Sequence, residues 1–494
     1  MRRMPQWMSE LLPIAILLTV IAVVSLRLPR APLGHSPEFR RRRFLNWFPV
    51  GLTYAFLYMG RYNLTVCKNA LGQVMSKEDF GTIFSIGTVV YGFSFVLNGP
   101  LTDKWGGKRT IILSALGAAA SNVAMGLVIA SGRREALLWI FAPLYAVNMY
   151  FQSFGAVSIV KVNSSWFHLR ERGTFGGIFG ILISLGIYFA FDWGQFIVDH
   201  APLPWVFFVP AILLSTLAIF DWRLVRDTPG EAGQADFDTA DSSSGDDGPA
   251  LSVLEVGKKM LRHPVIMTIA LVEFCSGYLR NAIMQWYPIM AKETGVGKAF
   301  VASHWGMVTC VAGILGGVFA GVISDRLFQS RRGPVSAVLY GAMLLGTGVM
   351  FAVLTTPLLG WLVVLMSLCI IGVHGMLSGT ASMDFGGKKN VGVAVGLIDG
   401  FVYLGTGLQA YVLGHVLPKD AAAKVTQNWW AWPVVMAPAA LAGFLLATRV
   451  WNAKPKPREF ASSEGGAEPK LAGGSGRLGL GGTRSPEVGV NEGP

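Results

Sequence analysis

Residues 99–109 read GPLTDKWGGKR, and residues 321–332 repeat their pattern as GVISDRLFQSRR. In each segment a glycine stands four residues before an aspartate–basic pair, and further basic residues follow. Glycine lets two helices approach closely, aspartate can cap or pair with a neighbouring helix end, and basic residues anchor a cytoplasmic face. Two such segments therefore predict two similar halves. The predicted cytoplasmic gate residues in them are Gly99, Asp103, Lys104, Lys108, Arg109, Gly321, Asp325, Arg326 and Arg331.

The composition around these segments is that of a membrane protein. The 494 residues are 52% hydrophobic and 14% charged, with a mean hydropathy of +0.49. Soluble domains carry about 25% charged residues. Runs of about 20 apolar residues can cross a bilayer as helices. We expect them near 45–70, 81–102, 109–131, 136–162, 173–198, 204–224, 264–290, 299–323, 334–356, 358–382, 391–417 and 428–450.

An interruption divides these twelve predicted spans into two sets of six. Residues 227–248 contain seven acidic residues and no basic one, among Gly, Ser and Thr, which is typical of a flexible linker. The tail beyond Trp451 is rich in Gly and Pro, and we expect it to be disordered. The predicted domains are an N-terminal helix and basic linker at 1–39, bundles at 40–226 and 261–451, a cytoplasmic linker at 227–260 and a cytoplasmic tail at 452–494.

The basic residues predict the orientation of the chain. The net charge of +12 could suggest a nucleic-acid partner, but the basic residues lie between apolar runs, as membrane topology requires. The side that holds residues 40–43 has the larger number of them and should be cytoplasmic. An earlier apolar run, residues 11–26, is followed by Arg27 and Arg30 instead of a cleavage site. We expect a retained thirteenth helix there, with a helix on the membrane surface as the alternative.

Arg61 and Arg280 lie inside apolar segments, FLYMGRYNLTVCKN (56–69) and FCSGYLRNAIMQWYP (274–288). Each is the seventeenth residue of its predicted helix, so each lies about 24 Å along that helix from its start, and the two should lie at similar depth. An arginine at membrane depth costs about 2.5–3.5 kcal/mol on insertion scales. Because guanidinium groups bind phosphate in a bidentate manner, a matched pair predicts a clamp for a dianion.

These repeats, spans and arginines resemble the major facilitator superfamily over residues 45–450, which implies two six-helix bundles related by pseudo-two-fold symmetry and alternating access to a midplane site. The arginines further resemble the organophosphate:phosphate antiporters, such as glycerol-3-phosphate and hexose-phosphate carriers. FQSFG (151–155), WFHLRERG (166–173) and RDTPG (226–230) also resemble that family. The resemblance implies that Arg61, Arg280, Tyr54, Tyr58, Tyr62, Tyr403 and Asp399 contact the substrate.

The chain departs from the glycerol-3-phosphate carriers at four places. At these places those carriers have, in chain order, a lysine, a second lysine, a histidine and an acidic residue. This chain has Tyr62, Phe95, Ile183 and Gln285 instead. The arginine pair remains, but with less positive charge around it. The substrate expected here is therefore a phosphorylated or otherwise anionic metabolite rather than a named compound.

Other intramembrane charges have two interpretations. Glu273 and Asp399 are candidate counter-ions or proton carriers, or they form helix-to-helix hydrogen bonds. Asp384 is expected to be a gate or capping residue, and His374 a packed histidine. The sequence contains no nucleotide loop, metal-ligand spacing or catalytic triad, and its four cysteines form no disulfide framework. It predicts neither an enzyme nor a cofactor.

The predicted function is exchange of an organic phosphate, namely a sugar phosphate or glycerol phosphate, for inorganic phosphate by alternating access. The expected protein is a monomer of the bacterial inner membrane. A proton-coupled symporter of organic anions that uses Glu273 or Asp399 is one alternative. A membrane sensor of sugar phosphate is another. The expected partners are a small phosphorylated metabolite, inorganic phosphate and the lipid bilayer, without nucleic acid.

Overall fold

The computed structural model describes residues 15, 17–23, 33–168, 171–237, 239, 255, 258, 261–328, 332–377 and 382–452. It gives the backbone alone at 172–177, 179, 321, 322, 325, 326 and 382–395. The described helices belong to one compact unit, Met1–Lys454. Of the predicted helix at 11–26 the structure describes residues 15 and 17–23, which are helical, and of the predicted tail at 452–494 it describes residue 452 alone.

The N-terminal half is helical throughout. Its elements are α2 (Pro37–Leu71), α3 (Lys77–Trp105), α4 (Gly107–Ala130), α5 (Leu137–Ser164), α6 (Arg172–Tyr188), the π-helix η3 (Phe189–Trp193), α7 (Gly194–His200) and α8 (Trp205–Leu224). Local sequence explains the helix ends. Ser36 caps α2 ahead of Pro37, and Ser76 and Asp79 form a capping box that begins α3.

The C-terminal half repeats this plan. Its elements are α10 (Pro264–Met284), α11 (Trp286–Glu293), α12 (Phe300–Ser303), α13 (Trp305–Leu327), α14 (Arg332–Val353), α15 (Leu358–Met376), α16 (Ser382–Val416), α17 (Asp420–Ala423), η6 (Thr426–Trp430) and α18 (Ala431–Arg449). Every long element of the described chain is helical, so the predicted all-α fold class is confirmed.

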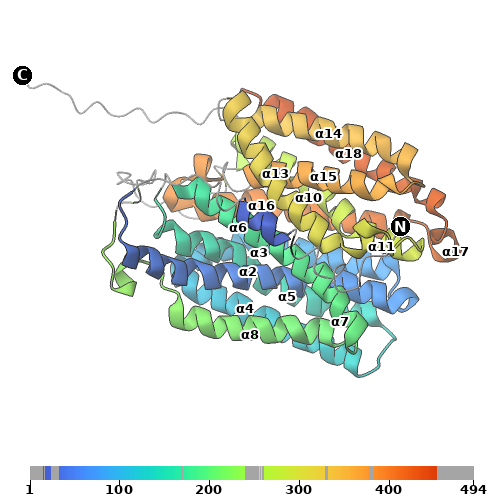
Figure 1. Cartoon of the computed structure of the whole chain (residues 1–494), viewed down its shortest axis with the longest axis horizontal. Coiled ribbons are helices and arrows are strands. Elements are labelled where there is room, and N and C mark those ends of the chain that lie inside the picture. Colours follow the sequence, from blue (N-terminus) through green and yellow to red (C-terminus); the bar gives the residue numbers. More distant parts are fainter. Residues whose placement is uncertain are drawn as a thin grey trace, which may run out of the picture. The chain divides into compact units, whose positions relative to one another are not determined.

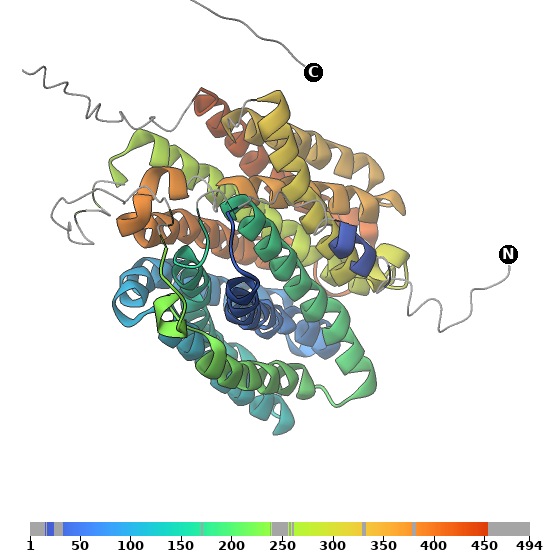
Figure 2. The ribbon, with the colours of Figure 1, turned by 60° about the vertical axis from the view of Figure 1, so that its left-hand side comes forward.

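The helices of each half lie together. In Figure 1, α4 and α8 lie along one side, α14 and α18 along the other, and α2, α3, α10 and α16 between them. Figure 2 keeps the same separation of the blue-to-green half from the yellow-to-red half. The halves meet where α3 packs along α16 and where α6 packs along α13. These two contacts place the middle of α2 and of α10 near the boundary of the halves.

Length and composition make seven of the described helices able to cross a membrane. Helices α2, α5, α10 and α16 are not among them, although each has 21 residues or more. These helices contain buried polar side chains, including Arg61, Gln152, Arg280 and Gln409. The polar groups that could serve a binding site are therefore what lowers their hydropathy.

Between α10 and α11 the helix is broken at Gln285. Pro288 has no backbone N–H to donate to the carbonyl of Met284, and the indole Nε1 of Trp305 donates to that carbonyl instead, at 3.0 Å. Trp432 Nε1 donates to the carbonyl of Ala282 at 2.9 Å. The two indoles satisfy backbone groups that the break would otherwise leave unpaired.

The first residues of the predicted linker pack on the N-terminal half. Asp227 Oδ1 accepts a hydrogen bond of 2.8 Å from the backbone N of Lys108, at the start of α4. The ring of Phe237 packs edge-on against that of Phe39 on α2. Asp227 and Phe237 thus hold the start of the predicted linker against α4 and α2. Residues 240–254 lie outside the described chain.

Candidate functional site

Arg61 is fully buried on α2 and donates hydrogen bonds through all three of its side-chain nitrogens. Nε donates to Gln152 Oε1 on α5 at 3.0 Å, and Nη2 donates to the Tyr91 hydroxyl on α3 at 3.0 Å. Nη1 donates to the Tyr403 hydroxyl on α16 at 2.8 Å, which joins the two halves. The guanidinium carbon also lies 4.5 Å from the ring centroid of Tyr91. Uncharged acceptors thus hold a charge that burial would otherwise disfavour.

A network of amides holds the backbone around Arg61. Asn148 Nδ2 and Asn122 Nδ2 donate to the carbonyl of Gly60 at 3.0 and 3.2 Å. Tyr145 donates to the carbonyl of Arg61 at 3.2 Å, and Gln152 Nε2 donates to Asn148 Oδ1 at 3.1 Å. The network fixes both the helix and the plane of the guanidinium group.

Arg280 lies on α10 and is buried, with 8% of its surface exposed. In the described part of the chain, no hydrogen bond or ion pair joins its guanidinium to another residue. It interacts electrostatically with Tyr62, Tyr403 and Tyr58, which also interact with Arg61. The two arginines, one from each half, therefore converge on the same tyrosines, but only Arg61 has its donors occupied by protein acceptors.

The predicted tyrosines form one face of α2. Tyr54 and Tyr58 pack edge to face with ring centroids 5.3 Å apart, and Tyr58 and Tyr62 follow at 5.6 Å. All three are at least 94% buried. The Arg61 guanidinium carbon lies 4.8 Å from the Tyr58 ring centroid. This tyrosine face is thus continuous with the arginine.

Glu273 is fully buried on α10 and lies 2.9 Å from His374 Nδ1 on α15. It also interacts electrostatically with Arg280. His374 was expected to be a packed histidine, and the structure gives it this acidic partner. Asp399 on α16 is 9% exposed and interacts electrostatically with His374. The predicted counter-ion candidates thus belong to one group beside Arg280.

The first of the repeated segments is described with its side chains. Gly99 lies inside α3, and Asp103 pairs with Lys161 of α5 at 2.8 Å, as expected for a contact with a neighbouring helix. Gly106, with a φ of 88°, separates α3 from α4, and Lys104, Lys108 and Arg109 lie around this turn. In the second segment the structure gives only the backbone of Gly321, Asp325 and Arg326. The same holds for Asp384. Arg331 lies outside the described residues entirely.

Charged contacts join the halves at the helix ends that the charge bias assigns to the outside. Lys77 of α3 pairs with Glu293 of α11, and Lys68 of α2 lies 3.8 Å from the same carboxylate. Lys419 pairs with Glu78. We name these five residues the outer ion cluster. Nearby, Asp192 of η3 accepts the backbone N–H groups of Gly306 and Met307 at 2.7 and 2.9 Å.

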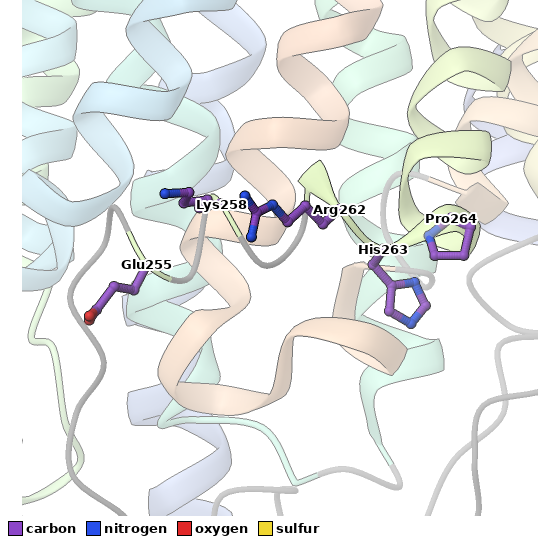
Figure 3. Close-up of a pocket in the computed structure, with 5 residues that line it drawn as sticks. All are labelled: Glu255, Lys258, Arg262, His263 and Pro264. Carbon is purple, nitrogen blue, oxygen red and sulfur yellow. The ribbon is translucent and has the colours of Figure 1, made fainter.

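A separate surface pocket of about 390 Å³ lies at the start of α10. Figure 3 shows its five lining residues strung along the segment that leads into this helix, namely Glu255, Lys258, Arg262, His263 and Pro264. All five are exposed, and none belongs to the arginine site. No group of three or more His, Cys, Asp or Glu residues in the described chain could hold a metal ion.

Sequence reasoning missed Tyr91 and Gln152 as members of the site. Gln152 belongs to FQSFG, a motif noted only as a family likeness, and Tyr91 lies one turn before Phe95, where a lysine was sought. Whether these side chains point toward Arg61 depends on how α3 and α5 are rotated about their axes. The sequence did contain a sign of both site residues, since each is a polar side chain in an apolar span.

Three comparisons relate the chain to known proteins. The sequence model of the Major Facilitator Superfamily matches residues 50–410. The glycerol-3-phosphate transporter of Bacillus subtilis (strain 168) is 27% identical over 446 residues, which cover 84% of this chain and 93% of the relative. The membrane sensor protein UhpC of Escherichia coli (strain K12) is 25% identical over 440 residues, covering 85% and 94%. A probable hexose phosphate transport protein of Chlamydia trachomatis is 22% identical over 446 residues, covering 85% and 94%.

Among solved structures, a bacterial homologue of the human lysosomal transporter Spinster, in an inward-facing and unoccupied conformation, superposes with a TM-score of 0.64. It shares 14% sequence identity, and the match covers 85% of this chain and 98% of that one. At this identity the likeness shows the fold.

Proposed function

We propose, because this chain belongs to the major facilitator superfamily, that it exchanges an organic phosphate for inorganic phosphate by alternating access. It is a multi-pass membrane transporter related to carriers of sugar phosphates and glycerol phosphate. One observation carries the finer proposal: a buried arginine from each half converges on one group of tyrosines.

The two arginines have different roles in this proposal. Arg280 has unoccupied donors and receives the phosphate first. Arg61 then exchanges its hydrogen bond to Tyr403 for one to a phosphate oxygen. A phosphate oxygen brings the opposite charge that the neutral Tyr403 hydroxyl lacks, and the guanidinium fork can hold it through two parallel hydrogen bonds, so the exchange is favourable.

Coupling follows from the charges. Closing the halves around two arginines without an anion leaves the positive charges uncompensated, whereas a phosphate dianion compensates both. Only such a difference in stabilisation can shift the equilibrium between conformations. The loaded carrier therefore reorients more readily than the empty one, which makes exchange faster than net efflux.

The Glu273–His374 pair favours the second candidate, proton-coupled transport of an organic anion. A carboxylate and an imidazole in direct contact form a pair through which a proton can pass from one group to the other. The sensor alternative rests on the similarity to the sensor protein UhpC. A sensor binds the phosphate ester without moving it.

Proteoliposomes loaded with inorganic phosphate test the three candidates. We expect uptake of labelled phosphate to require phosphate inside and to be insensitive to a pH gradient. Arg61→Lys and Arg280→Lys should each reduce exchange about 10- to 100-fold, because lysine keeps the charge and loses the bidentate fork. Arg134→Lys, on an exposed loop, is the matched control.

Uptake that follows the pH gradient without internal phosphate would favour the proton symporter. Binding of a phosphate ester without any transport would favour the sensor. Full exchange activity in both site variants would remove the arginines from the mechanism.

A further inference from the structure

Four uncharged polar residues form a second group, displaced toward the outside from the arginines. Thr65 lies four residues after Arg61 on α2, and Asn281 and Gln285 lie one and five residues after Arg280. Gln409 lies six residues after Tyr403 on α16. These helices all run outward in the charge-based topology, so most of the group lies about 6–9 Å beyond the arginines. We name Thr65, Asn281, Gln285 and Gln409 the amide layer.

The members of the amide layer bond to one another in two pairs. The Thr65 hydroxyl donates to Gln285 Oε1, and Asn281 Nδ2 donates to Gln409 Oε1. Thr65, Gln285 and Gln409 are completely buried, and Asn281 is 4% exposed. The first pair joins the two halves, while the second lies within the C-terminal half.

Each pair leaves one donor without a partner. Gln285 Nε2 and Gln409 Nε2 are buried and make no hydrogen bond. Exchanging the oxygen and nitrogen positions of either side-chain amide would not remove the problem. Each carboxamide has one protein partner, so the exchange would leave the oxygen unpaired in place of the nitrogen. Of the three buried carboxamide nitrogens without a partner in the described chain, two belong to this layer.

Packing alone does not account for these groups. A buried donor without a partner destabilises a fold, and an apolar side chain of similar volume would avoid the loss. These two donors also follow Arg280 of α10 and Tyr403 of α16, five and six residues further along. A ligand that reaches from the arginines into the amide layer would satisfy them.

We propose that the amide layer binds the oxygen atoms of the organic part of the substrate, an inference that rests on the proposed function. With phosphate held by Arg61 and Arg280, the two Nε2 donors face the hydroxyl or carbonyl oxygens of a short, oxygen-rich carbon chain. The amide layer thus favours esters whose carbon chain carries hydroxyl or carbonyl oxygens over alkyl or aromatic phosphates.

The pair between Thr65 and Gln285 also fixes the direction of the bound molecule. This hydrogen bond breaks when the halves part on the outside, which frees both side chains. A phosphate ester that enters from the outside then passes the layer with its phosphate leading and leaves its carbon chain there.

Two ligands that differ only in their hydroxyl groups test the inference. Glycerol 3-phosphate and propyl phosphate are compared as competitors of labelled-phosphate exchange in proteoliposomes. The wild type should bind glycerol 3-phosphate at least tenfold more tightly, because a site built to hydrogen-bond a hydroxyl leaves its polar groups unpaired with the analogue that lacks it.

Gln285→Leu and Gln409→Leu should each lose most of this preference. The preference is measured as the ratio of the two esters' inhibition constants within one variant, so that a change in the rate of phosphate self-exchange cancels. Asn163→Leu is the matched control. Asn163 is a buried amide with an unpaired oxygen, eleven residues nearer the cytoplasmic end of α5 than Gln152. It should retain the preference.

Equal competition by the two ligands in a wild type that exchanges phosphate would overturn this inference and leave the proposed function intact. So would layer variants that weaken phosphate and both esters equally. A wild type that exchanges no phosphate would overturn the proposed function and this inference with it.

Discussion

The two arginines are alike in sequence and different in environment. Arg61 is enclosed by Gln152, Tyr91 and Tyr403, whereas Arg280 has electrostatic neighbours and no hydrogen-bonded partner in the described chain. Equal spacing along two helices predicted equal depth, which stays a prediction, and both side chains are buried. It could not predict this difference, because the acceptors around Arg61 come from three other helices.

Tyr403→Phe should tighten the binding of inorganic phosphate by about tenfold, since Arg61 then has no hydroxyl to exchange for a phosphate oxygen. Titration calorimetry of the detergent-solubilised protein measures this change in Kd. Tyr287→Phe on α11 is the control, because Tyr287 is buried away from the arginine site and its hydroxyl makes no hydrogen bond to the described chain. Weaker binding in Tyr403→Phe would mean that the hydroxyl contacts the substrate.

Glu171 tests electrostatics outside the membrane. Burial opposes its charged form, but a hydrogen bond of 2.8 Å from Arg43 and the charge of that arginine outweigh it, and the pKa of Glu171 lies below its ordinary value of 4.5. A lowered carboxyl pKa stabilises the folded protein above pH 4.5, and this contribution is lost as the pH falls through the folded-state pKa.

Glu171→Gln should therefore lower the unfolding temperature by a few degrees at pH 7, with the difference shrinking below pH 4.5. Thermal unfolding in detergent across this pH range measures it. A difference that stays constant with pH would assign the effect to packing instead of charge.

At the scale of elements, the contact between α3 and α16 depends on glycine. A Cβ atom at Gly400 would lie 3.0 Å from the carbonyl oxygen of Gly92, and one at Gly92 would lie 2.9 Å from that of Gly400. Periodicity predicts that both helices exist, but it does not predict which faces touch. The repeated segment at 99–109 predicted a close helix contact at Gly99. The close contact described here is at Gly92, two turns earlier on α3.

Gly400→Ala should slow exchange about tenfold, because the helices must move apart to admit the methyl group and the interface between the halves is disturbed. Gly348→Ala is the matched control, since its Cβ meets nothing within 4 Å and alanine favours the helix. Initial rates of phosphate exchange measure both. Normal exchange in Gly400→Ala would show that this contact tolerates separation.

At the scale of the whole molecule, the predicted family is confirmed by the match over residues 50–410 and by relatives at 22–27% identity. The division into domains and the roles of the site residues stay predictions. The fold was accessible from sequence because hydropathy and the repeated segments are local signals. The amide network and the outer ion cluster were not, since their members are far apart in the chain and meet only after the helices pack.

Glu293→Gln should favour opening toward the outside by about tenfold or more, because it leaves the buried amines of Lys68 and Lys77 together without a counter-charge. Distances between spin labels on the outer ends of α2 and α11 measure the populations. Glu135→Gln, which removes an exposed acid from an outer loop, is the control. An unchanged distance distribution in Glu293→Gln would show that these ion pairs do not hold the halves closed.

The π-helix η3 has a consequence for insertions and deletions. Its wide turn carries Asp192 to the backbone N–H groups of Gly306 and Met307 in the other half. Removing a single residue from Phe189–Trp193 would shift everything on one side of the turn by about 100° around the helix axis. The contact is thus specified by the number of residues in the helix as much as by the carboxylate. A one-codon deletion between Phe189 and Phe191 would turn the Asp192 carboxylate away from Gly306 and Met307 without changing a single side chain that bridges the halves.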